Sequence, residues 1–180
     1  MELKGIGVGS QAAVGDVFRL EPSGVVSEHR TTSHTPGEEA SVLATAIATT
    51  AATIREETSS SDATTIEIMG ALLIILEDPE LQEMAKPFLE EGFDAPTALF
   101  KALDAFAELM GDDEDFQSRV GDLRGIATRI SSWVRGIAQG PSIPQEGRWI
   151  IVAEDLTVLE TSQFGESVVG VVTELGGPTS

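Results

Sequence analysis

The spacing of apolar residues divides the chain into a helical middle and two ends of different character. From Val42 to Ile54, apolar side chains return every three or four residues, as they do on one face of a helix. Thr35-Pro36-Gly37-Glu38 precedes them with a capping threonine, a first-turn proline and a glutamate three residues after the cap, an order that begins helices. Ser59 to Ser61 ends this first predicted helix.

Four more helices are predicted by the same signals. Asp62, Asp78 and Asp94 each precede an apolar periodic segment and can cap it. Three of the predicted helices run from Asp62 to Glu77, from Glu80 to Glu90 and from Asp94 to Met110. The last, of about 25 residues, carries apolar residues from Phe116 to Ile137 and stops at Gly140-Pro141.

The hydrophobic period changes at both ends of the chain. Glycines interrupt the apolar stretch from Gly5 to Leu20, and a short strand is predicted at Val25-Val26. Trp149 to Val152 and Val168 to Val172 are apolar runs of the length of buried strands. Thr157 to Glu160 forms a capping box, which predicts a short helix between these two strands. A strand, a helix and a strand of these lengths indicate a parallel crossover unit.

This order of elements predicts a helical domain inserted into an α/β domain, so the fold class is α/β with α+β character and mostly helical. We assign residues 1–33 and 144–180 to an incomplete α/β domain and residues 34–143 to the insertion. Two or three strands cannot cover both faces of a parallel sheet. We therefore expect a truncated α/β domain.

The amino-acid composition excludes several kinds of catalytic group, metal site and binding partner. The chain has no Cys and only two histidines, His29 and His34, which excludes disulfides, thiol nucleophiles and Cys-ligated zinc and leaves no multi-histidine metal site. Eleven Lys and Arg against 30 Asp and Glu give a net charge of −19. That charge repels nucleic-acid phosphates and anionic membranes, so we expect neither as a partner. With no signal peptide, and with no apolar run longer than Gly70 to Leu76, a cytoplasmic protein is predicted.

Negative charge is densest in the predicted helical domain. From Glu56 to Ser118 there are seventeen Asp and Glu and only two cations, Lys86 and Lys101. Charge of this density raises association rates with a basic partner. The alternative interpretation is an ordinary solvated helix face, which such charge runs usually form.

The C-terminal part of the chain contains a series of distinctive motifs. They are the segment from Val152 to Thr157, Glu160-Thr161, and Val168 to Thr173 leading into Gly176-Gly177-Pro178-Thr179-Ser180. This series resembles the motifs of Enzyme I, the family of phosphoenolpyruvate–protein phosphotransferases that starts the bacterial sugar phosphotransferase system. Three further stretches match the family: Gly5-Ile6 with Gly15, Glu77 to Leu81, and Arg119 to Arg124. Pro178, Leu72 and Gly9-Ser10 depart from it, where Arg, His and Ser-Pro are usual.

This resemblance implies a partial phosphohistidine swivelling domain with an inserted four-helix domain that binds the phosphocarrier HPr. The phosphorylated histidine would directly follow Ser180. Phosphoenolpyruvate and magnesium would bind to a C-terminal barrel that these residues do not include, and that barrel would also hold the contacts of a homodimer. The parent is then a phosphoenolpyruvate–protein phosphotransferase, and this fragment, with no cofactor of its own, is expected to be inactive alone.

The resemblance also implies site residues. Thr161 would orient the phosphohistidine ring, and the turn around it would be formed by Gly176, Gly177, Thr179 and Ser180. The expected contacts to HPr are three apolar residues and three polar ones on the second and third predicted helices and the long helix, with a methionine on the helix between: Ile74, Ile75, Leu81, Asp78, Glu80, Arg119 and Met110. The competing interpretation places leucines at this helical spacing in the core.

Other interpretations remain open. One is an Enzyme I-like part of a multiphosphoryl protein of dihydroxyacetone kinase; pyruvate phosphate dikinases lack the helical insertion. Another is an acidic helical adaptor without phosphotransfer. Thr32-Ser33-His34-Thr35 mimics the active-site tetrapeptide, but no Gly-Gly and no buried strand precede it, so we interpret His34 as a solvated loop residue, and His29 likewise.

Overall fold

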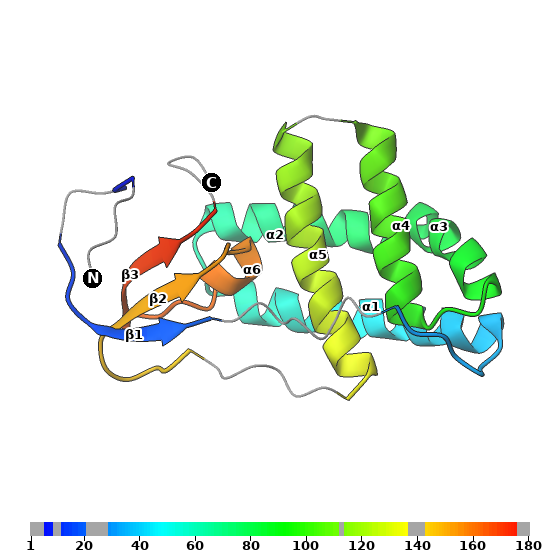
Figure 1. Cartoon of the computed structure of the whole chain (residues 1–180), viewed down its shortest axis with the longest axis horizontal. Helices are drawn as coiled ribbons and strands as arrows, with labels where there is room; N and C mark the ends of the chain where they lie inside the picture. The colour runs from blue at the N-terminus through cyan, green and yellow to red at the C-terminus, as the bar shows by residue number, and fades with distance from the viewer. Residues whose placement is uncertain (1–5, 9–11, 21–28, 112–113, 137–142, 176–180) are drawn as a thin grey trace. The chain divides into compact units, whose positions relative to one another are not determined.

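The computed structural model describes residues 6–8, 12–20, 29–111, 114–136 and 143–175 (Figure 1). The chain divides into two compact units. The sheet unit contains Met1–Pro22, Gly140–Leu156 and Gln163–Ser180, and the helical unit contains Ser23–Gln139 and Thr157–Ser162. The domain boundaries predicted after residues 33 and 143 stay a prediction, because compactness alone does not establish a domain.

The sheet unit holds three parallel strands in the order β1 (Asp16–Arg19), β2 (Trp149–Ala153) and β3 (Val168–Thr173). Phe18 pairs with Ile151 across the first pair of strands, and Ile151 pairs with Val171 across the second. Strands from opposite ends of the sequence therefore share one sheet, which confirms the predicted α/β arrangement with a helical insertion.

The first strand is shorter than the apolar stretch predicted it to be. Of the described residues in 5–20, only Asp16–Arg19 forms a strand, because only this segment finds a register with β2. Gly15 precedes it at a point of close approach, where a Cβ atom would lie 2.5 Å from the carbonyl oxygen of Arg148. The strand predicted at Val25-Val26 lies outside the described residues.

The helical unit begins its helices where the sequence predicts. Side-chain oxygens of Thr35, Asp62, Asp78 and Asp94 each accept a backbone N–H in the first turn that follows. The helices are α1 (Pro36–Thr58), α2 (Ala63–Leu76), α3 (Pro79–Glu90), α4 (Ala95–Met110), α5 (Glu114–Val134) and the single-turn α6 (Val158–Thr161).

The long helix α5 ends earlier than predicted. It stops at Val134 instead of reaching Ile137. Gly136 has a φ of +63°, a left-handed conformation that cannot continue an α-helix. The N–H of Arg135 still donates to the carbonyl of Ser131 at 2.9 Å and closes the last turn.

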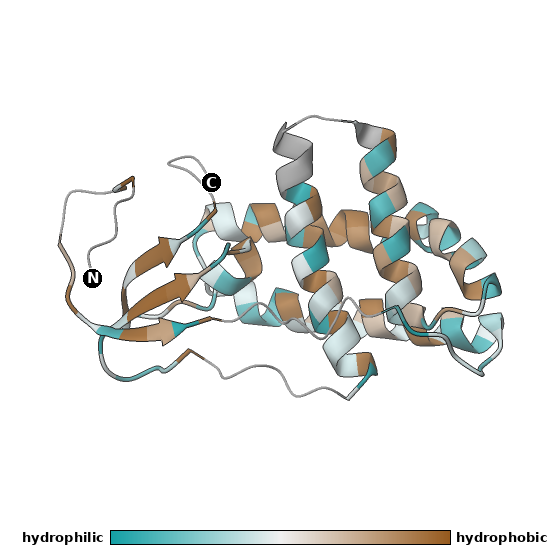
Figure 2. Cartoon of the chain, viewed as in Figure 1, coloured by the Kyte–Doolittle hydropathy of each residue, from teal (hydrophilic) through white to brown (hydrophobic). Residues whose placement is uncertain are grey.

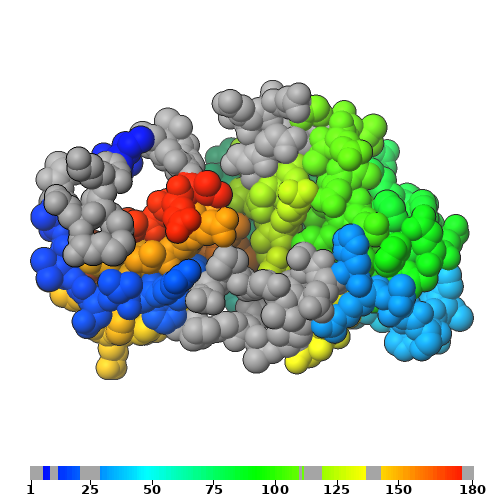
Figure 3. Space-filling view, in the orientation of Figure 1, coloured from blue at the N-terminus to red at the C-terminus, as the bar shows by residue number. Residues whose placement is uncertain are grey.

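Within the helical unit, α4 and α5 run side by side, both contact α1, and α5 also contacts α2 (Figure 1). Figure 3 shows α4 and α5 as neighbours on one face of this unit. On α1 the buried apolar residues include Leu43, Ile47 and Ile54, whereas Val42, expected on that stripe, is half-buried. The largest fully buried side chains come from four helices and form one core: Leu43, Ile47, Ile54, Met69, Leu72, Leu73, Leu76, Leu99, Leu103, Leu123, Ile126 and Ile130. In the described part of the chain, no helix combines the length and the hydropathy of a membrane span.

We expect Leu103→Ala to lower the free energy of unfolding by about 2–5 kcal/mol, because a fully buried leucine is replaced by a cavity. Urea denaturation followed by circular dichroism measures the change. Leu109→Ala is the matched control, since Leu109 lies on the same helix and is 76% exposed; its effect should stay below about 0.5 kcal/mol. Equal losses in both variants would contradict the core described above.

Candidate functional site

The turn between α2 and α3 brings five of the predicted site residues together. Asp78 lies in this turn as the N-cap of α3, and its Oδ1 accepts the N–H of Glu80 at 2.8 Å. Pro79 occupies the first helical position, where a missing N–H costs nothing. The segment 74–81 is therefore a helix–turn–helix corner whose second helix is capped by Asp78.

Exposure separates the apolar residues of this corner. Ile74 is 70% exposed, whereas Ile75 is half-buried against the core. Leu81 is only 3% exposed, so its side chain supports the corner from beneath and offers no surface to a partner. Asp78 and Glu80 are exposed.

Helix α2 is apolar on its outer face as well as on its inner one. Met69, Leu72, Leu73 and Leu76 face the core, and Figure 2 shows hydrophobic residues along much of the helix. The outer face carries what we call the α2 ridge: Ile66, Gly70 and Ile74, all exposed. Two exposed isoleucines on one face of a helix make that face a candidate binding surface.

Carboxylates surround the ridge. Glu67 on α2 is exposed, and Glu77 at the end of α2 forms an ion pair with Arg55 of α1. The Arg55 guanidinium lowers the pKa of Glu77 through its hydrogen bonds. At the start of α2, hydrogen bonds from the hydroxyl and N–H of Thr65 lower the pKa of Asp62. Asp62 and Glu77 therefore stay ionised at neutral pH, but Arg55 balances the charge of Glu77, so it is Asp62 that adds net negative charge near the ridge.

The cations of the helical unit are mostly engaged with carboxylates. Ion pairs join Arg124 to Asp104 at 2.5 Å and Arg129 to Glu57 at 2.6 Å. Lys101 lies over the ring of Phe93 at 4.7 Å. Arg119, exposed on α5, has no ion pair among the described residues. Met110 ends α4, but its side chain lies outside the described part of the structure.

Helix α6, which links β2 and β3 along the chain, belongs to the helical unit. Asp122 of α5 accepts the N–H of Val158 at 3.0 Å, and Leu159 joins the helical core. Gly125 makes the contact close, because a Cβ atom there would lie 2.9 Å from Cγ2 of Thr157. Asp122 and Gly125 thus fix α6 on α5, a role that their positions in the sequence did not reveal.

Thr161 lies at the end of α6 and is exposed. Its hydroxyl donates to the carbonyl oxygens of Thr157 at 3.2 Å and Val158 at 3.1 Å. The hydroxyl oxygen therefore keeps lone pairs that can accept a hydrogen bond from another group. The four remaining predicted site residues lie outside the described residues: Gly176, Gly177, Thr179 and Ser180.

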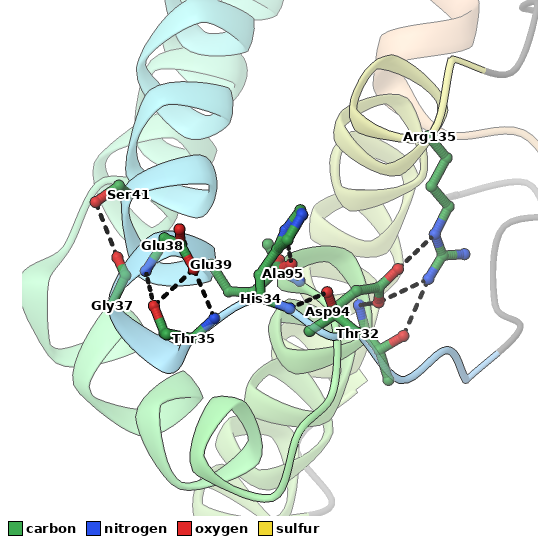
Figure 4. Close-up of polar contacts among 11 residues, drawn as sticks. Thr32, His34, Thr35, Gly37, Glu38, Glu39, Ser41, Asp94, Ala95 and Arg135 are labelled. Carbon is green, nitrogen blue, oxygen red and sulfur yellow. Dashed lines mark hydrogen bonds and ion pairs between the residues drawn. The ribbon is translucent and has the colours of Figure 1, made fainter.

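A polar network that the sequence did not reveal joins three helices (Figure 4). Glu39 of α1 is 4% exposed; its carboxylate accepts the N–H of Ala95 at 2.7 Å and contacts Nδ1 of His34 at 2.9 Å. Next to it, Arg135 donates to both carboxylate oxygens of Asp94, at 3.0 and 3.1 Å. His34 is thus exposed, as predicted, but attached to a buried carboxylate.

No group of three or more His, Asp or Glu within the described ranges is arranged to hold a metal ion. The magnesium implied by the resemblance was expected on a barrel outside this chain, and it stays a prediction.

Comparisons with known proteins agree with this architecture. Residues 4–119 match the family model for PEP-utilising enzymes, N-terminal. The phosphoenolpyruvate-protein phosphotransferase of Haemophilus influenzae is 41% identical over 114 residues, which cover 60% of this chain and 20% of that protein. The protein of the same name from Bacillus subtilis is 31% identical over 191 residues, which cover 99% of this chain and 33% of that protein. The chain therefore spans a third or less of these relatives.

Two solved structures share the fold. The N-terminal domain of Enzyme 1 - Nitrogen has a TM-score of 0.62 at 22% identity and covers 93% of this chain and 72% of its own. A solution structure of Enzyme I (nEIt) has a TM-score of 0.64 at 25% identity and covers 85% of this chain and 66% of its own.

Gly125→Ala and Gly121→Ala form a matched pair on α5. A Cβ atom at Gly121 meets nothing within 4 Å, so that variant should gain about 0.5–1 kcal/mol of stability from helix propensity. Gly125→Ala should be at least about 1 kcal/mol less stable than Gly121→Ala, because its methyl group overlaps Thr157. Urea denaturation gives the difference, and amide exchange at Val158 should accelerate only in Gly125→Ala. An equal gain in both variants would mean that α6 does not pack on α5 in this way.

The ion pair of Glu77 predicts a component of acid sensitivity. The pKa of Glu77 is lower in the folded chain than the value of about 4.3 expected when unfolded, so its stabilising contribution is complete above that value and disappears as the pH falls through the folded pKa. Both partners are partly exposed, which limits the contribution to about 0.2–1 kcal/mol.

Glu77→Gln should therefore be less stable than the unchanged chain at pH 7, and the two should converge as the pH falls from about 5 to about 3. Urea denaturation across this range measures the difference. Glu67→Gln, which removes an exposed carboxylate with no ion pair in the described structure, is the control. The difference in its free energy of unfolding from that of the unchanged chain should not change with pH over this range. If the difference in the free energy of unfolding between Glu77→Gln and the unchanged chain stays constant over this pH range, the ion pair is not a source of acid sensitivity.

Proposed function

The chain belongs to the family of PEP-utilising enzyme N-terminal domains, and from this we propose that it is the N-terminal region of a phosphoenolpyruvate–protein phosphotransferase of the Enzyme I type. We propose further that its helical unit docks the phosphocarrier HPr. The observation that carries the docking proposal is the exposed α2 ridge beside the α2–α3 corner, where Ile74 is 70% exposed among carboxylates.

The reaction proposed for the whole enzyme is a relay between two histidines. A ring nitrogen of the first attacks the phosphorus of phosphoenolpyruvate; the bond from phosphorus to the enol oxygen breaks, and pyruvate leaves as its enolate. A histidine of HPr then takes the phosphoryl group. The resemblance places the first histidine directly after Ser180 and assigns Gly176, Gly177, Thr179 and Ser180 to the turn that holds it.

Thr161 is suited to the supporting role proposed for it. Because its hydroxyl proton is directed to backbone carbonyls of α6, its oxygen can accept the N–H of an imidazole. That bond would leave the opposite ring nitrogen unprotonated, which is the form that attacks phosphorus. Asp122 and Gly125 of α5 position α6, the helix that carries Thr161.

Docking would combine an apolar centre with a charged rim. Ile74 would lie at the centre with Ile75 beside it, while Leu81 keeps the corner rigid from below. Asp78 and Glu80 would form the acidic rim facing the basic surface of HPr. Charge of opposite sign accelerates association and orients the partners, but most of the affinity comes from the buried apolar centre. Met110 and Arg119 are proposed as further contacts from α4 and α5.

Titration of ¹⁵N-labelled Bacillus subtilis HPr with the 180-residue chain tests this proposal. HPr resonances around its histidine should shift at about 20 mM salt, and the affinity should fall about tenfold by 300 mM, because salt screens the rim charges. Ile74→Ala should raise the dissociation constant about five- to tenfold.

Val17→Ala is the matched control for Ile74→Ala, because Val17 is a β-branched residue exposed to a similar extent, 67%, on the sheet unit. It should leave the affinity within about twofold. HPr resonances that stay unshifted at low salt, or equal effects of the two variants, would contradict docking on the α2 ridge.

A further inference from the structure

Gly70 occupies the middle of α2, a position where glycine is costly. Glycine is the weakest helix former apart from proline, because it loses the most backbone freedom when it becomes helical. Gly70 lies seven residues after the first residue of α2 and six before the last, so it serves neither cap of the helix.

Nothing inside the protein requires a glycine there. A Cβ atom at Gly70 would meet no other atom within 4 Å, unlike one at Gly125, which would overlap Thr157. Gly121 is also exposed, but the residues one turn away on either side of it in the sequence are Gln117 and Gly125, and neither is apolar and large. Gly70 differs because exposed isoleucines lie one turn away on either side, Ile66 at 44% and Ile74 at 70% exposure.

We call the notch the exposed position on α2 where Gly70 has no side chain between the exposed Ile66 and Ile74. Residues four apart lie in one row on a helix, and at 1.5 Å per residue Ile66 and Ile74 are separated by about 12 Å along the axis. The absent side chain of Gly70 leaves a gap between the two isoleucines, and the helical backbone beneath it is already hydrogen-bonded to itself. Such a gap accepts an apolar side chain, as the holes of packed helices accept knobs.

We propose that Gly70 is a specificity-determining residue of the docking surface, and that the notch receives one protruding apolar side chain from the middle of HPr's basic face. This inference rests on the proposed docking function. The carboxylates around the notch select a partner whose basic residues surround that apolar side chain, and the absence of a Cβ atom allows close approach.

Two substitutions at one position test the proposal. Gly70→Ala and Gly70→Leu both favour a helix, and a Cβ atom at this exposed position meets no other atom within 4 Å, so thermal unfolding should show both variants at least as stable as the unchanged chain. Titrations with ¹⁵N-labelled Bacillus subtilis HPr should nevertheless show the dissociation constant raised about tenfold for alanine and about a hundredfold for leucine, as the notch fills. Gly37→Ala, at an exposed and equally open glycine in the first turn of α1, should change the affinity by less than twofold.

The outcomes separate this inference from the docking proposal. One outcome is that the unchanged chain binds HPr, Ile74→Ala weakens binding, and both Gly70 variants bind normally. In that case HPr docks on the ridge but the notch has no role, and this inference is wrong. If the unchanged chain does not bind HPr, docking and notch are both wrong. A stable Gly70→Leu variant with weakened binding supports the notch, because a structural defect would lower its stability too.

Discussion

The parallel pairing of β1 with β2 is the constraint on which the rest of the chain depends. Parallel strands run in the same direction, so a chain that leaves the C-terminal end of β1 must return to the end where β1 began before β2 can start. Here the return takes the 129 residues from Leu20 to Arg148. The entropy lost by closing so long a loop grows only slowly with its length. The helices between the strands contribute nearly all of the buried core, and only Leu159 of that core comes from α6, beyond β2.

Helix starts could be predicted from the sequence because they depend on neighbouring residues. Thr35, Asp62, Asp78 and Asp94 each act within three residues of themselves, and all four cap as expected. Features that depend on distant residues could not be found in this way. Glu39 accepts a hydrogen bond from Ala95, 56 residues away, and no local pattern distinguishes it from an exposed first-turn glutamate.

The same distinction explains what could be known of the candidate site. The motif from Glu77 to Leu81 located the α2–α3 corner correctly, but α2 carries apolar residues on its outer face as well as on its inner one, so periodicity could not say which isoleucine is exposed. The structure exposes Ile74 and keeps Ile75 and Leu81 against the core. Asp122 lies within a stretch that resembles the family, yet its role as a cap for α6, 36 residues later, required coordinates.

The helical unit is discontinuous in the sequence, which limits how it can be transferred between genes. The chain enters it at Ser23, leaves after Gln139 and enters it again for Thr157–Ser162, so it is built from two separate stretches. Leu159, on the second stretch, is part of its core. A gene segment encoding only the first stretch would yield a bundle with an unfilled apolar site. The unit therefore cannot be transferred as one continuous gene segment. Recombination that moved it to another protein would also have to transfer Thr157–Ser162, the segment between β2 and β3.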